Sequence, residues 1–241
     1  GLACIASGEH RAAAEILGAL DSIDEGLRRQ RLGTAGYPVP QTYGWLAWSL
    51  AERGEFDAAV ARAEEGLRLG EALEDPHTIA VVCRGFAHAR GVKGELDDAI
   101  PLAERGLAIC REWKLTAALL SITGTLGHLY ARSGRITEGL ALLHDAFEGT
   151  QSLGFGFFHS VIAVQLGEAS LLGDRAADAA RFAERGLVLA RDGGQRGCEA
   201  TARWVLGRVA AHSDAPDEAV AERHYHAAFT LADTLGMRPL A

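Results

Sequence analysis

A column of chemically varied side chains returns every 40 residues along the chain. Each member stands two residues after a large apolar residue, and an earlier row stands four residues before it, on the same face of a helix. Arginine binds carboxylates well and tryptophan is a common apolar anchor, so these rows could hold a peptide in a groove. The residues predicted to bind a partner there are Trp48, Arg84, His88, His128, Glu168, Trp204 and Arg208.

The same pattern has a second interpretation that the residues leave open. The column could be a set of solvated helix positions with some aromatic packing between neighbouring copies. The two interpretations differ in whether the side chains are available to a partner or are occupied by each other.

Metal binding and catalysis find little support in the sequence. His224 and His226 are two residues apart, so on a helix they point to nearly opposite sides. His88 and His128 could face one another, but no third ligand is evident, and zinc normally takes three or four. There is no GxSxG nucleophile and no GxxxxGK phosphate loop. We therefore expect no metal, no cofactor and no enzyme activity.

A 40-residue repeat indicates which elements position the column. AEEGLRL at 63–69 returns as AERGLAI at 103–109 and AERGLVL at 183–189, while LHDAFEG at 143–149 keeps small and large residues in the same places. The steps of seven between small residues place them on one helix face, where two helix backbones can approach closely. The sequence therefore predicts paired helices throughout, with no competing strand pattern.

Glycine-bearing breaks divide each repeat into two helices. RGEFD at 53–57, KGELD at 93–97, SGRIT at 133–137 and LGDRA at 172–176 fit the end of one helix and the start of the next. Each unit is thus a helical hairpin, and residues 1–241 are expected to form a single superhelical domain. The expected hairpins lie near residues 1–36, 37–76, 77–116, 117–156, 157–196 and 197–241.

The pattern resembles the tetratricopeptide repeat (TPR), a helical hairpin that stacks into a right-handed α-solenoid. Leu126-Gly127 with Tyr130, followed by Gly139, Leu143 and Ala146, is the best single match. The usual TPR period is about 34 residues, so a period of 40 implies longer helices or loops. The resemblance implies an all-α solenoid of about six TPR-like hairpins.

Longer phrases are similar to the helical C-terminal regions of bacterial signalling proteins that combine an adenylate or guanylate cyclase domain with a P-loop ATPase. These phrases are IPLAERGLAICREW (100–113), LYARSGRITEGLALL (129–143), LGEASLLGDRAADA (166–179) and AERHYHAAFTLADTLGMRPLA (221–241). The resemblance implies a sensory or scaffolding array and does not bring the cyclase or ATPase activity with it.

Composition limits the choice of partner. The formal charge of −8 gives no general attraction for nucleic acid or anionic lipid. The stretches without charged residues are too short and too polar for membrane spans. Cys4, Cys83, Cys110 and Cys198 form no CxxC pair, and we interpret them as buried thiols of a cytoplasmic protein. We therefore expect no nucleic acid and no membrane partner.

The sequence best fits a scaffold that binds a protein, a peptide or a neighbouring domain of its parent protein. One alternative is the effector-sensing module of a TPR-containing transcriptional activator. Another is a self-assembly module that forms a homo-oligomer. For that alternative, the aromatic stretch GFGFF at 154–158 could form an apolar patch, or its phenylalanines could begin the next helix and pack inside.

Overall fold

The computed structural model describes residues 2–31, 33, 36–154, 156–212 and 216–240. Every regular element in these ranges is a helix, so the prediction of an all-α fold is confirmed. None of the helices in the described ranges is both long enough and apolar enough to cross a bilayer. The elements are α1 (Leu2–Ser7), α2 (His10–Gly18), η1 (Ala19–Ser22), α3 (Glu25–Arg28), α4 (Pro38–Glu52), α5 (Phe56–Ala72), α6 (Pro76–Lys93), α7 (Leu96–Glu112), α8 (Thr116–Arg132), α9 (Ile136–Ser152), α10 (Gly156–Leu172), α11 (Ala176–Asp192), α12 (Arg196–His212) and α13 (Glu218–Leu235).

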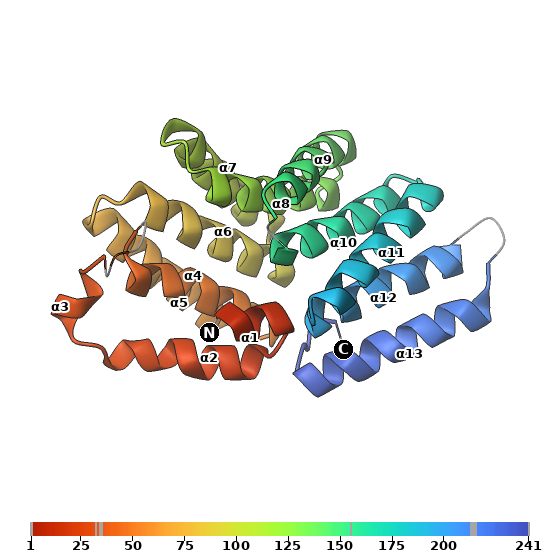
Figure 1. Ribbon diagram of the computed structural model, residues 1–241, viewed down its shortest axis with the longest axis horizontal. Coiled ribbons are helices and arrows are strands. Elements are labelled where there is room, and N and C mark those ends of the chain that lie inside the picture. The colour runs from red at the N-terminus through yellow and green to blue at the C-terminus, as the bar shows by residue number, and fades with distance from the viewer. Residues whose placement is uncertain (1, 32, 34–35, 155, 213–215, 241) are drawn as a thin grey trace. The chain divides into compact units, whose positions relative to one another are not determined.

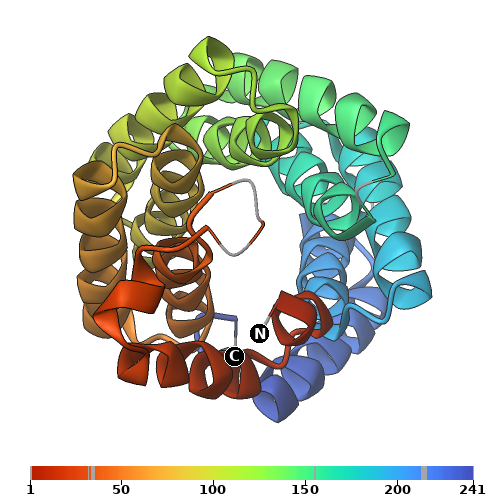
Figure 2. The same ribbon diagram turned by 60° about the vertical axis from the view of Figure 1, so that its left-hand side comes forward.

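The helices group into two compact units. The first comprises Gly1–Ile5 and Glu9–Thr125, and the second comprises Ala6–Gly8 and Leu126–Ala241. In the first unit α4 packs against α5 and α6, and α6 packs against α7 (Figure 1). In the second unit α10 and α12 form one layer and α9, α11 and α13 form the other (Figure 2). The layer formed by α10, α12 and Leu126–Arg132 of α8 is called the first-helix layer of the second unit.

The turns within the hairpins recur at the 40-residue spacing. Gly54, Gly94 and Gly134 adopt left-handed backbone conformations with φ of 74°, 94° and 90°, and Asp174 takes the same place with φ 56°. Glycine adopts this region without steric cost, and aspartate is one of the few other residues that visit it. These residues let each first helix end and the second helix fold back along it.

Small residues stand where the two helices of a hairpin meet. A Cβ atom added to Gly127 of α8 would lie 2.9 Å from the carbonyl oxygen of Gly139 and 3.0 Å from the amide nitrogen of Leu143, both in α9. Gly167 meets Ala183 of α11 in the same way, and Gly207 lies under the ring of Tyr225 in α13. The expected close approach of helix backbones is therefore present at Gly127 and Gly167, whereas Gly207 makes room for the Tyr225 ring of the paired helix.

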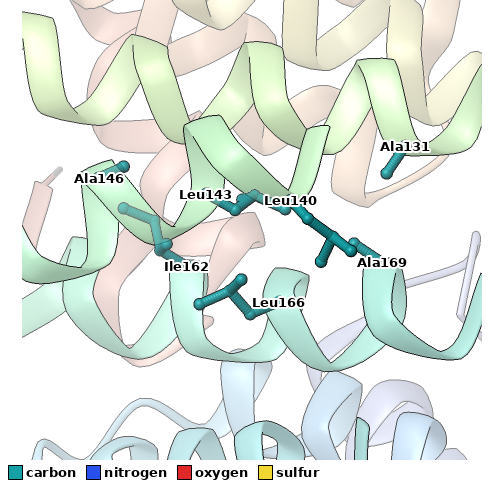
Figure 3. Close-up of a cluster of buried hydrophobic side chains, with 7 residues drawn as sticks. All are labelled: Ala131, Leu140, Leu143, Ala146, Ile162, Leu166 and Ala169. Carbon is teal, nitrogen blue, oxygen red and sulfur yellow. The ribbon is translucent and has the colours of Figure 1, made fainter. Parts of the chain in front are cut away.

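Larger side chains fill the space on either side of these contacts. In the second unit Leu140 and Leu143 of α9 point toward Ile162 and Leu166 of α10 (Figure 3). Phe158, in the first turn of α10, packs against this cluster as a partly buried residue. Phe157 also lies in α10 and is half-buried, whereas Phe155 falls outside the described residues. The helix α10 thus takes up the end of the GFGFF stretch.

The segment before residue 37 departs from the repeat. Ala19, Gly26 and Leu27 occupy the register positions of buried small and large residues, yet all three are exposed. The connection to α4 is also longer than the later connections between hairpins. From Pro38 onward α4 contains Trp45 and Trp48, as the sequence predicts, and the regular hairpins begin.

The cysteines divide into two pairs by burial. Cys83 in α6 and Cys110 in α7 are inaccessible to solvent, whereas Cys4 and Cys198 are half-buried, and none of the four is in a disulfide. Burial raises the pKa of the Cys83 and Cys110 thiols to about 11. These two thiols therefore stay protonated at neutral pH and act as small apolar core residues.

Substitution of Gly127 by leucine should lower the free energy of unfolding. The new side chain would begin within 3.0 Å of α9 backbone atoms, so α8 and α9 must separate, at a cost of about 1–3 kcal/mol. Gly156→Leu is the matched control, because a Cβ atom there meets nothing within 4 Å. Urea unfolding followed by circular dichroism measures both. Equal midpoints for the two variants would contradict the packing role of Gly127.

Candidate functional site

In the first unit the column joins α4 to α6. The imidazole of His88 stacks on the indole of Trp48, with ring centroids 3.6 Å apart and an angle of 5° between the planes. His88 Nε2 lies 2.7 Å from the carboxylate of Glu52, one turn after Trp48 on α4. The ring is thus held on its face by a tryptophan and at its edge by an acid.

Arg84 lies on the same face, one turn before His88. Its guanidinium carbon is 4.1 Å from the centre of the Trp45 ring and 4.9 Å from that of Trp48. Such stacking stabilises a cation against an aromatic face. Burial lowers the pKa of the Arg84 guanidinium to about 9, so the group still carries its charge at neutral pH.

The Glu52 carboxylate stays ionised although only 16% of its side chain is exposed. Burial by itself would raise its pKa, but the hydrogen bond from His88 and the nearby His88 and His10 rings outweigh it, so the pKa lies below its ordinary value. His10 comes from α2 and is itself buried, and this burial lowers its pKa. Glu52 therefore links α2, α4 and α6 through charge as well as contact.

Trp204 and Arg208 of the column in the second unit are more open to solvent than Trp48 and Arg84 of the first. Glu168 of α10 lies between His128 of α8 and Arg208 of α12: Oε2 is 2.8 Å from His128 Nε2, and Oε1 is 3.9 Å from Arg208 Nη1. The Arg208 guanidinium stacks over the ring of Trp204, 4.8 Å from its centre. The side chain of Arg208 is 26% exposed, whereas Trp48 and Arg84 of the first unit are buried.

Several positive groups surround the Glu168 carboxylate. Burial would raise its pKa, but His128 lowers it by charge and by a hydrogen bond, and Arg132 and Arg208 lower it further, so the net pKa lies below its ordinary value. One carboxylate thus faces two arginines and a histidine.

The predicted site residues fall into two separate groups. Trp48, Arg84 and His88 come together in the first unit, and His128, Glu168, Trp204 and Arg208 come together in the second. The repeat register did not point to four further members, which lie outside the two rows: His10, Trp45, Glu52 and Arg132. The only signal for Glu52 was its place one helical turn after Trp48.

Metal-ligating residues do not cluster in the described part of the chain, where no group of three histidines, cysteines or acids could hold an ion. His224 is half-buried in α13, and the neighbouring Tyr225 covers Gly207 of α12. Burial lowers the pKa of the His224 imidazole. Tyr225, the middle residue of the HYH sequence, therefore contributes to the packing between α12 and α13, whereas His226 is exposed.

The fold defines the class of protein: the chain is an α-solenoid of TPR-like helical hairpins. No protein-family model matches the chain, and no curated protein matches it in sequence. Solved structures do match it. Bacillus thuringiensis PlcR, in complex with the peptide PapR7 and DNA, matches with a TM-score of 0.69 and 13% identity over 86% of this chain and 74% of PlcR.

Two further similar structures contain tetratricopeptide or TPR-like repeats. PH0952 from Pyrococcus horikoshii, a signal transduction ATPase with a tetratricopeptide repeat sensor, matches over 93% of this chain but 34% of its own, with 13% identity and a TM-score of 0.56. TPR-like repeats of a kinesin light chain from Podosopora anserina match over 83% of this chain and 97% of their own, with 15% identity and a TM-score of 0.52. Identities this low establish the shared fold alone.

The buried His10 makes the stability of the protein depend on pH. Its pKa is lowered in the folded state from 6.5, so just below pH 6.5 the unfolded chain binds more protons than the folded chain. Stability therefore rises with pH through this window and falls as the pH drops below about 6.5. Burial lowers the pKa of His77, His159 and His224 too, which gives the same sign.

Urea unfolding at several pH values around 6.5 measures this dependence. In the His10→Gln variant the free energy of unfolding should depend less steeply on pH, because the buried imidazole whose pKa is lowered on folding has been removed. His226→Gln, at an exposed position of α13, is the control and should keep the slope of the unmodified protein. Identical slopes for all three proteins would contradict the role given to His10.

Proposed function

We propose that this protein is a non-catalytic scaffold that binds a peptide or a protein segment. The partner contacts the first-helix layer of the second unit, at the cluster formed by His128, Glu168, Trp204 and Arg208. One observation carries the proposal: these side chains are polar or amphipathic and partly exposed, while the packing of the same helices is completed by small and apolar residues.

The chemistry of the cluster suits recognition of an extended chain. Trp204 offers a large apolar surface, and Arg208 beside it offers hydrogen-bond donors in a planar fork. The corresponding residues of the first unit are less suited to this role, because Trp48 and Arg84 are buried and stacked on each other. We therefore assign Trp48, Arg84 and His88 to holding α4 and α6 together, and the partner to the second unit.

The scaffold would serve as the regulatory or interaction segment of a larger bacterial signalling protein of the cyclase or ATPase type. The similarity to PH0952 supports this assignment, since that protein joins an ATPase to a TPR sensor. The phrases shared with cyclase-linked arrays point in the same direction. In this setting the partner is a peptide or a neighbouring domain of the parent protein, within the cytoplasm.

A second candidate is a peptide-sensing effector module of a transcriptional activator. The similarity to PlcR in its complex with a peptide and DNA favours it. The two candidates share the same binding layer and differ in what the array is joined to. The second candidate predicts a neighbouring DNA-binding domain, and the first predicts a neighbouring cyclase or ATPase domain. Sequencing of the surrounding coding region tests the two expectations.

Replacement of both Trp204 and Arg208 by alanine should weaken peptide binding by at least about tenfold, because the apolar anchor and the cation are lost together. Isothermal titration calorimetry with peptides selected from a random library against the unmodified protein measures the affinity. The matched control replaces Trp113 and Arg181, which are exposed and lie outside the cluster. If the control loses as much affinity as the test variant, or the test variant loses none, the proposed surface is wrong.

A further inference from the structure

Arg208 uses its hydrogen-bonding capacity unlike the other arginines paired with acids. Arg68 and Arg135 each donate two hydrogen bonds to one carboxylate, through Nε and Nη2 at 2.6–3.0 Å. Arg208 instead comes no closer than 3.9 Å to Glu168, beyond ordinary hydrogen-bond distance. Across the described residues, no carboxylate accepts a hydrogen bond from its guanidinium. Its planar fork is therefore available to another acceptor.

The guanidinium is nevertheless held in place. It lies over the ring of Trp204, one turn earlier on α12, and the charge of Glu168 draws it toward α10. A cation that is already ordered loses little conformational entropy when a ligand arrives. Arg208 is thus a positioned donor group whose preferred acceptor, a carboxylate, lies too far away for a direct bond.

Glu168 has a closer partner on its other side. His128 is 2.8 Å away, so the carboxylate remains hydrogen-bonded when Arg208 turns away from it. With Arg132 also close, removing Arg208 from the pair leaves Glu168 with positive charge beside it. The arrangement separates into two parts: a stable His128–Glu168 pair and an arginine that Glu168 attracts through space.

We propose that Glu168 acts as an internal stand-in for a carboxylate of the partner, which Arg208 binds in its place. This rests on the proposed function and specifies its ligand: a peptide segment that carries a carboxylate next to an apolar side chain. The carboxylate receives the two hydrogen bonds of the Arg208 fork, and the apolar side chain lies on Trp204. The positive charge of Arg208 matches such a ligand.

The negative charge of Glu168 sets the threshold for binding. It competes with the incoming carboxylate for Arg208 and repels it, so weakly acidic or poorly placed segments are rejected. Removing that charge while keeping the shape should strengthen binding of acidic peptides. A residue that only fastened α10 to its neighbours would not produce such a gain.

Hexapeptide libraries attached through their N-termini provide the test. One library ends in free acids and one in amides, and each contains members with Asp or Glu and matched members with Asn or Gln. The unmodified protein should prefer carboxylate-bearing peptides by about tenfold. Comparison of the four classes shows whether the carboxylate comes from a side chain or from the chain end.

Variants of the two residues complete the experiment. Arg208→Gln should lose the preference for carboxylates, Arg208→Lys should keep only part of it, and Glu168→Gln should bind acidic peptides several-fold more tightly than the unmodified protein. Arg181→Gln, an exposed arginine of α11 paired with Asp178, removes the same charge elsewhere and should change nothing. Circular dichroism melts confirm that each variant is folded.

The outcomes separate this inference from the proposed function. Peptide binding that depends on Trp204 but not on carboxylates would overturn the stand-in role and leave the scaffold function intact. Unchanged or weaker binding of acidic peptides by Glu168→Gln would also overturn it. A protein that binds no library member more strongly than its Trp204→Ala variant would contradict both proposals.

Discussion

Close contact between helix backbones is the constraint on which the rest of the structure depends. In the first unit a Cβ atom added to Gly44 of α4 would lie 2.9 Å from the Cα of Val82 in α6, so no larger residue fits without moving a helix. This proximity lets the Trp48 and His88 rings, one turn further along, stack at 3.6 Å. Small residues thus decide which large side chains can meet, because side chains reach only a few ångströms beyond their backbones.

The same column serves different purposes in the two units because its surroundings differ. Around Trp48 two tryptophans, an arginine and a histidine exclude water, and the Glu52 carboxylate needs its partners because an unpaired buried charge is costly. Glu168 is surrounded by fewer aromatic rings and more cationic groups than Trp48 is. Arg208, one of these cations, is partly exposed. The Glu168–Arg208 pair is long and Arg208 is partly exposed, so this pair contributes little to stability and leaves the arginine available for recognition.

The sequence predicted the fold well because the relevant signals are local. A 40-residue period, small residues at steps of seven and a glycine in each turn determine paired helices without reference to distant contacts, although Asp174 shows that glycine is not obligatory at the turn. The side-chain pairing of the column was not predictable. Whether Trp48 faces solvent or His88 depends on the separation of α4 and α6, and the period does not reveal that separation. The exposed Ala19 and Gly26 show that register alone does not guarantee burial.

A framework held by backbone contacts has a consequence for binding. Contacts such as that between Gly167 and Ala183 would be lost if the helices moved apart and would become clashes if they moved closer. The backbone positions of the surface residues are therefore set before a partner binds. The conformational entropy lost on binding then comes mainly from the partner. The affinity depends on which side chains the column presents. Changing one residue of a column therefore alters ligand choice without altering the fold. Glu168 and Arg208 illustrate this principle: opposite charges at equivalent positions on neighbouring helices lie 3.9 Å apart, while the Arg208 guanidinium stacks over Trp204.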